Sequence, residues 1–216
     1  MSRRCRRLTN FRMVNWHKCA DSGIINLNGN TLISGQTGSG KSTFVDALYL
    51  VQTLNEHNFN KASGDNSKRD LRSYVRCRED KLDSKGNRNP YSRKGRVVTY
   101  LLAEMVDKYD NVIVIGTCFV SASDTSDIDK HYFEIRNIEL ADINVLDEQR
   151  RPLEWKAFQS QFSIHDFTSP KTKTDALKLF ARAHGFKAEQ VDDYQHMCAI
   201  NAKIMAGKAN MVNVDQ

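Results

Sequence analysis

The sequence predicts an α/β fold in which a glycine-rich loop leads into a helix, joined to an antiparallel β lobe and peripheral helices. Two observations support this. Residues Gly35–Thr43 read GQTGSGKST, and two apolar runs, Arg96–Val106 and Val112–Val120, flank a short polar turn. Runs that are apolar on both faces are typical of strands buried within a sheet. A chain of 216 residues is long enough for one substantial domain with a small appendage.

The glycine-rich loop matches G-x-x-x-x-G-K-[ST], the P-loop pattern. Glycines let the backbone N–H groups converge on one point, and the helix that follows adds its positive N-terminus. Lys41 supplies charge for the β- and γ-phosphates, the Ser42 hydroxyl can ligate Mg²⁺, and Thr43 is placed to reach the α-phosphate. We therefore predict that ATP and Mg²⁺ bind at the nine loop residues, Gly35, Gln36, Thr37, Gly38, Ser39, Gly40, Lys41, Ser42 and Thr43.

Both flanks of the loop fit a phosphate site. Asn30–Ser34 is a short β-prone run that predicts a buried strand before the loop. A helical stripe follows the loop, at Phe44, Ala47, Leu48 and Val51. Upstream, Arg7–Trp16 and Ile24–Leu27 have the composition of strands. A tryptophan at a strand end, here Trp16, more often packs in the core than stacks on adenine.

The C-terminal third predicts one more strand and several helices. The strand is expected at Tyr132–Leu140, and the helices are expected from Pro152 onward, from Ser169 to His184 with Gly185 as C-cap, and at Ala188–Met205. The six histidines show no metal-ligand spacing.

Residues Ile143–Glu148 have an apolar run followed by Asp147 and Glu148, the order found in a Walker B strand. Asn144 interrupts that run, and a Walker B strand is buried beside the P-loop strand. We therefore predict a solvated loop here, which leaves the chain without a complete hydrolytic site.

Positive charge is concentrated in two places, although the net charge is only +6. One cluster is Arg3–Arg12 and the other is Lys68–Arg96. Lysine and arginine neutralise phosphates, so the second cluster is a candidate for sequence-independent DNA contact, with Lys68, Arg69, Arg72 and Arg76 as the proposed residues. A charged, solvated loop explains the same composition equally well.

The cysteines, the apolar runs and the N-terminal segment indicate in which compartment the protein is located. The five cysteines are scattered and form no C-x-x-C pair, which argues for a reducing compartment. The longest apolar run, Val112–Val120, is far below the ~20 residues that a membrane helix needs. The basic N-terminus has no apolar segment of a signal peptide behind it. We expect a cytoplasmic protein without a membrane partner.

Two segments resemble the N-terminal head segment of SMC-type ATPases: Leu8–Trp16 (LTNFRMVNW) and Leu32–Leu48 (LISGQTGSGKSTFVDAL). The similarity spans about Arg7 to Leu54. The branch that the chain resembles is the MukB-like proteins, which include the JetC subunit of Wadjet plasmid-defence systems. Thr37 replaces the asparagine common in SMC loops, which favours this branch over chromosomal SMC proteins.

The resemblance implies an ABC/SMC-type P-loop NTPase half-head. Residues 1–140 would form the ATP-binding part with its β lobe and basic loop, and residues 141–216 a helical extension toward a coiled coil outside this chain. A C-terminal half-head would supply the signature, Walker B and D-loop, so the ATPase is incomplete in this chain, and a second SMC-like subunit would engage it. Asp70–Arg76 resembles the family's arginine-bearing loop with Arg72 in the sensing position, which implies double-stranded DNA as partner and a place at the nucleoid, in chromosome organisation or plasmid defence.

Two other classes of function use the same loop. A P-loop kinase for small molecules would employ Lys68–Arg96 as its arginine lid, although kinases usually place the loop after their first strand. A non-catalytic DNA-binding module that holds ATP is the other alternative.

Overall fold

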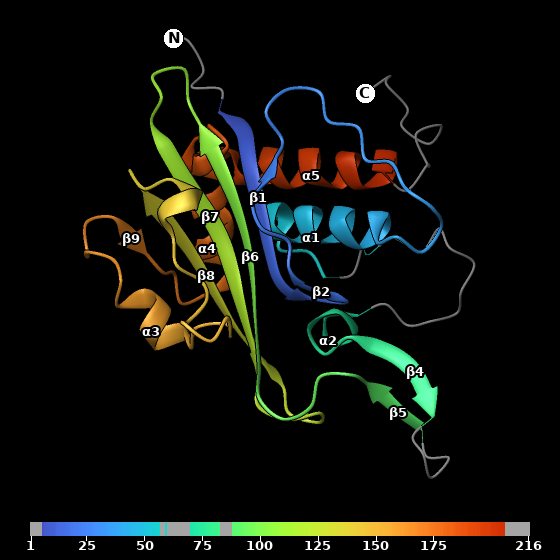
Figure 1. Ribbon diagram of the computed structural model, residues 1–216. Helices are drawn as coiled ribbons and strands as arrows, with labels where there is room; N and C mark the ends of the chain where they lie inside the picture. Colours follow the sequence, from blue (N-terminus) through green and yellow to red (C-terminus); the bar gives the residue numbers. More distant parts are fainter. Residues whose placement is uncertain (1–5, 57–58, 60–69, 83–87, 206–216) are drawn as a thin grey trace.

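The computed structural model describes residues 6–56, 59, 70–82 and 88–205, and a single large antiparallel sheet organises it (Figure 1). The strand order is β2-β1-β6-β7-β8-β9, with β3 paired to β1. These strands are β1 (Arg7–Trp16), β2 (Cys19–Asp21), β3 (Ile25–Asn26), β6 (Val97–Val106), β7 (Val112–Ser121), β8 (Ile128–Arg136) and β9 (Phe167–Thr168). A separate hairpin pairs β4 (Arg78–Leu82) with β5 (Arg88–Tyr91).

Helices cover both faces of the large sheet (Figure 1). On one face lie α1 (Lys41–Thr53), α4 (Lys173–Ala183) and α5 (Val191–Met205), and on the other lies α3 (Trp155–Gln159). The short α2 (Leu71–Val75) precedes β4, and the 3-10 turns are η1 (Leu140–Asp142) and η2 (Ala188–Gln190). Within the described residues, no helix combines the length and apolar character needed to cross a membrane.

The predicted hairpin of two apolar strands is confirmed and forms the centre of the sheet. β6 and β7 pair without interruption from Val97↔Ser121 to Val106↔Val112. Successive side chains of a strand point to opposite faces, so the two strands supply two separate clusters. Leu101 contributes to the cluster under the helices, and Leu102 to the cluster on the face of α3. A sheet apolar on both faces must be covered on both.

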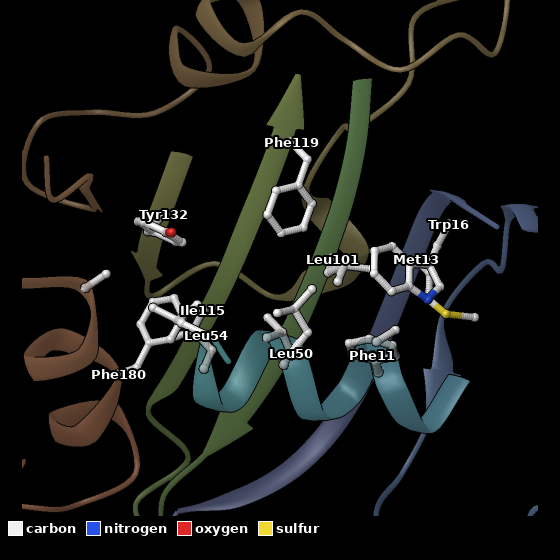
Figure 2. Packing of buried hydrophobic residues seen from close by; sticks show 14 of the residues in the cluster. Phe11, Met13, Trp16, Leu50, Leu54, Leu101, Ile115, Phe119, Tyr132 and Phe180 are labelled. Carbon is white, nitrogen blue, oxygen red and sulfur yellow. The ribbon is translucent and has the colours of Figure 1, made fainter. Parts of the chain in front are cut away.

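The helix after the glycine-rich loop provides part of that cover. Leu50 and Leu54 lie against Leu101 of β6 and Ile115 of β7, and Phe180 of α4 joins the same cluster (Figure 2). The predicted helix is therefore confirmed, but its buried surface is wider than the predicted stripe. α5 also packs against α1, so the helix is enclosed by more than the sheet.

Two elements begin at residues other than those predicted. The strand expected at Tyr132–Leu140 is β8, which begins four residues earlier because Ile128 already pairs with Ser121 of β7. The helix expected from Ser169 begins at Lys173, where the Thr172 side chain accepts a hydrogen bond from the Asp175 N–H. The helix ends with His184 as its C-cap, and Gly185, predicted as the C-cap, follows one residue later with φ 88°.

Residues after position 140 complete both clusters. Ile143, Val145 and Phe158 are buried with the side chains of β6 and β7 on one face, and α4 and α5 pack on the other. The segment 141–205 thus shares its core with the strands β1, β6, β7 and β8 and with α1, and its continuation toward a coiled coil stays a prediction.

Gly116 on β7 is required by packing. A Cβ built there would lie 2.3 Å from Phe133 Cζ and 2.9 Å from the Leu101 carbonyl oxygen. We predict that Gly116→Ala lowers the free energy of unfolding by about 1–3 kcal/mol, the usual cost of forcing atoms into a filled core. Chemical denaturation measures this. Adding Phe133→Leu, which shortens the facing side chain, should recover part of the lost stability. An unchanged denaturation midpoint for Gly116→Ala alone would contradict the packing seen here.

Candidate nucleotide-binding site

The glycine-rich loop forms a turn that ends at the first residue of α1. Gly38 and Gly40 have φ of 83° and 93°, a left-handed conformation that residues with a side chain rarely adopt. A Cβ at either position would meet nothing within 4 Å, whereas one at Gly35 would lie 2.7 Å from Ser39 Oγ. The backbone is therefore tightly curled and open toward solvent at the two glycines where a phosphate group would approach.

The N–H groups of the loop are arranged for an anion. The first hydrogen bond of α1 runs from the Phe44 N–H to the Gly40 carbonyl at 2.9 Å, so the N–H groups of Lys41, Ser42 and Thr43 precede the helical ladder. The positive end of the α1 dipole lies at the same point. Within the loop, the Ser39 N–H donates to the Gln36 carbonyl at 3.2 Å. The donor set and the space around it fit a nucleotide phosphate chain.

Lys41 lies over the loop. Its Nζ donates to the carbonyl oxygens of Gly35 at 2.5 Å and Gln36 at 2.8 Å. These contacts hold the ammonium group close to the loop backbone, where it would meet the β- and γ-phosphates of a bound nucleotide. Ser42, next along α1, is the residue that would hold Mg²⁺.

The strand predicted before the loop is wrong as an element of this chain's sheet. Asn30–Ser34 forms no strand, Leu32 is 90% exposed and Ile33 is 40% exposed. The connection from β3 to α1 runs outside the sheet (Figure 1). On its outer side β1 already pairs with β2 and β3, and a strand needs a partner for its backbone hydrogen bonds. The apolar, β-prone composition of residues 30–34 was therefore not sufficient to predict a strand.

The segment Ile143–Glu148 forms no strand, as predicted, but it is solvated only at its end, because Ile143 and Val145 are buried in the core. Asp147 accepts hydrogen bonds from the N–H groups of Gln149 at 3.0 Å and Arg151 at 2.8 Å, and from Arg151 Nε at 2.9 Å. The backbone donor of Arg151 is the largest cause that lowers the pKa of Asp147. Glu148 is exposed. The carboxylate of Asp147 therefore closes a surface turn, and this segment lacks the buried strand of a Walker B motif.

The arginine-bearing segment Asp70–Arg76 contains the short helix α2, and one of its arginines is not available to DNA. Arg76 is fully buried, and its Nη1 lies 2.6 Å from Asp124 Oδ1. Burial lowers the pKa of Arg76, and the Asp124 charge opposes that shift. Its other donors reach Ser121 and the carbonyls of Arg93 and Gly95. As a DNA contact, Arg76 is therefore corrected to a structural ion pair.

Arg72 is half-buried, and its Nη1 donates to the Asp124 carbonyl at 2.7 Å. Its side chain stays a candidate for phosphate contact. Lys68 and Arg69 lie outside the described residues.

Other cations of the basic stretch also bind within the protein. Arg93 donates to the carbonyls of Val75 and Cys19, both at 3.3 Å. Lys94 lies 3.4 Å from Asp124 Oδ2, and Arg96 pairs with Glu154 at 2.7 Å. The charge count of a segment therefore overstated the charge that it presents to a partner.

Three residues that the sequence did not single out position the site. Asp124 accepts hydrogen bonds from Arg72 of α2 and from Arg76, which follows it, Asp46 is buried within α1, and Tyr74 of α2 donates a hydrogen bond to Asp46. The only sequence signal was Asp46 itself, a carboxylate among the apolar residues of the α1 stripe. Trp16, in contrast, is fully buried, which confirms the packing interpretation.

Comparison with known proteins supports the nucleotide site. Residues 8–66 match the family described as the P-loop containing region of AAA domain. No curated protein matches the chain. The match covers the first strand, the glycine-rich loop and α1, and it supports a P-loop NTPase region and hence nucleotide binding in this chain.

Lys41→Ala should weaken binding of Mg-ATP by about ten- to a hundredfold, because a charge-assisted contact with phosphate contributes about 1.5–3 kcal/mol. Lys173→Ala is the matched control, since Lys173 is also the first residue of a helix and lies outside the loop. Isothermal titration calorimetry measures both. Equal ATP affinity of the wild type and Lys41→Ala would rule out the assignment of this loop.

Proposed function

We propose that this chain is the ATP-binding N-terminal half of an SMC-like ATPase head of the MukB/JetC type, which acts on DNA once a C-terminal half-head completes it. One observation carries the proposal: a well-formed P-loop follows directly on an apolar, strand-prone segment that has no strand partner within the described residues. A P-loop whose preceding strand pairs only after assembly is what a half-head requires.

The residues of this chain bind and orient the nucleotide. The N–H groups at the start of α1 and the Lys41 ammonium neutralise the phosphates, and Ser42 holds Mg²⁺. The metal, when bound, supplies charge neutralisation at the phosphates. The Asp147–Glu148 segment offers no buried carboxylate for the attacking water, since Asp147 closes a surface turn and Glu148 is exposed. Hydrolysis would need groups from the C-terminal half-head.

The exposed residues 30–34 also support a head that is divided between two half-heads. Leu32 is the most exposed large apolar side chain among the described residues. Isolated exposed leucines are common, but this one lies within a run of β-prone residues immediately before the P-loop. A strand of the C-terminal half-head pairing with residues 30–34 would bury Leu32 and Ile33 and satisfy the backbone groups between them.

The other two classes of function have less support. A small-molecule kinase would need mobile arginines above the phosphates, whereas Arg76 is buried in an ion pair and Arg93 donates to backbone carbonyls. A passive ATP-holding module needs no partner for residues 30–34 and leaves the exposure of Leu32 unexplained.

Turnover tests the proposal. The isolated chain should hydrolyse ATP at background, and Glu148→Gln should change nothing. Addition of a C-terminal head segment that bears the signature and Walker B sequences should raise turnover. Leu32→Glu should abolish this rescue while leaving ATP binding intact, because a charge cannot be buried at the new sheet contact.

Ile164→Glu is the control for Leu32→Glu, since Ile164 is also almost fully exposed (88%) but lies beyond α3. It should leave the rescue unchanged. Steady ATP hydrolysis by the isolated chain that disappears in Glu148→Gln would show instead that the chain holds its own complete site.

DNA binding is tested separately. We expect sequence-independent binding of duplex DNA with a dissociation constant of roughly 10⁻⁴ to 10⁻⁶ M. For each phosphate contact, the logarithm of the binding constant should fall by about 0.9 for every tenfold rise in salt concentration. Arg72→Glu should lower both the affinity and the salt slope without changing ATP binding. Lys156→Glu, on α3, carries the same charge change on the opposite face of the sheet and serves as control. Fluorescence titration at low salt that finds no binding, or binding unaffected by Arg72→Glu, would remove DNA from the proposal.

A further inference from the structure

Two tyrosine hydroxyls contact helix α1, one in its first half and one at its end. Tyr74 of α2 donates to the Asp46 carboxylate, in the second turn of the helix. At the end of the helix, Tyr194 of α5 donates to the Gln52 carbonyl. Tyr74, Asp46 and Tyr194 are all buried. The first contact is nearer to the P-loop in sequence, because Asp46 follows Thr43 by three residues.

Tyr74 is itself part of a packed group that reaches the loop. Its ring stacks on the indole of Trp16 with a centroid separation of 4.5 Å and an interplanar angle of 10°. Trp16 Nε1 donates to the Thr43 carbonyl at 2.9 Å. The His17 N–H donates to the Tyr74 carbonyl at 2.7 Å. Thr43 and Asp46, both in the first half of α1, are therefore fixed by two neighbouring aromatic side chains from β1 and α2.

α2 cannot shift freely relative to this group. Arg76, the C-cap residue of α2, is buried and forms an ion pair with the partly exposed Asp124, and the N-cap Asp70 accepts hydrogen bonds from the N–H and hydroxyl of Ser73. A five-residue helix held at both ends provides a rigid support for the Tyr74 ring. That support lies on the side of α1 where the phosphate-binding N–H groups begin.

We infer that Tyr74 is a positioning residue for nucleotide binding: with Trp16, it fixes the start of α1 so that the N–H groups of the P-loop stay directed at one point. The inference rests on the proposed binding of ATP at this loop. A site that already has its bound geometry binds its ligand more tightly, because less conformational entropy is lost on association. The contacts that carry this role run from Tyr74 to Asp46 of α1 and to the Trp16 ring.

Tyr74→Phe should weaken Mg-ATP binding by about three- to tenfold, the effect of one hydrogen bond lost from the support of the site. Tyr194→Phe removes the equivalent hydroxyl at the other end of the same helix and should leave ATP affinity within twofold of wild type. Because Tyr74 acts through the phosphate-binding N–H groups, Mg-tripolyphosphate should lose the same factor as ATP in Tyr74→Phe. Calorimetry on the full chain measures both ligands, and thermal unfolding checks that each variant is folded.

The outcomes separate the two hypotheses. No ATP binding by the wild type overturns the proposed function. Wild-type binding with equal affinities in Tyr74→Phe, Tyr194→Phe and wild type overturns the positioning role and leaves the function standing. Equal losses in both variants overturn it as well, because they indicate general loosening of α1.

A second pair of variants covers the case in which Tyr74→Phe does not fold. Trp16→Phe removes the donor to the Thr43 carbonyl but keeps an aromatic ring, and Trp155→Phe changes the other tryptophan, which packs on the opposite face of the sheet. Loss of ATP affinity in Trp16→Phe alone supports the inference. Equal affinity in the two tryptophan variants overturns it.

Discussion

The continuous pairing of β6 with β7 is the constraint on which the rest of the structure depends. Ten residue pairs place apolar side chains alternately on the two faces, and Gly116 lets Phe133 of the neighbouring strand pack directly over the backbone. Because neither face can be left to solvent, segments on both sides of the hairpin in sequence must fold over it. The glycine-rich loop is attached to one of these segments, so the position of the nucleotide site follows from how α1 covers the sheet.

The site combines a rigid half with an open half. Behind the P-loop, α1 is fixed by Leu50 and Leu54 in the core and by Trp16 and Tyr74 beside its start. In front of it, residues 30–34 extend outside the sheet with their apolar side chains exposed. Phosphate binding needs only the rigid half, since it depends on N–H groups and Lys41. In the proposed half-head, chemistry at the γ-phosphate would need groups on the open side, and this asymmetry is the physical basis of that proposal.

The basic stretch shows why charge in a sequence is not charge on a surface. Arg76 is buried and paired with Asp124, Lys94 pairs with the same carboxylate, and Arg93 donates to main-chain carbonyls. These cations join α2 and the segment after β5 to the β7–β8 loop. A buried guanidinium left without Asp124 would be strongly unfavourable, so this ion pair holds α2 in place. Arg72 remains half-buried at the edge of this network, which makes it the described residue of the predicted DNA set best placed to meet a phosphate.

Local patterns in the sequence determined the glycine-rich loop with its following helix, the β6–β7 hairpin and the surface turn at Asp147, because each depends on residues close together in the chain. The bounds of β8, the buried state of Arg76 and the support of α1 by Tyr74 were decided by tertiary structure, since each depends on a partner far away: Ser121, Asp124 and Asp46. The segment 30–34 has the composition of a strand but no strand partner among the residues that the structure describes. Composition sets what a segment can form, whereas a strand exists only where another backbone accepts its hydrogen bonds.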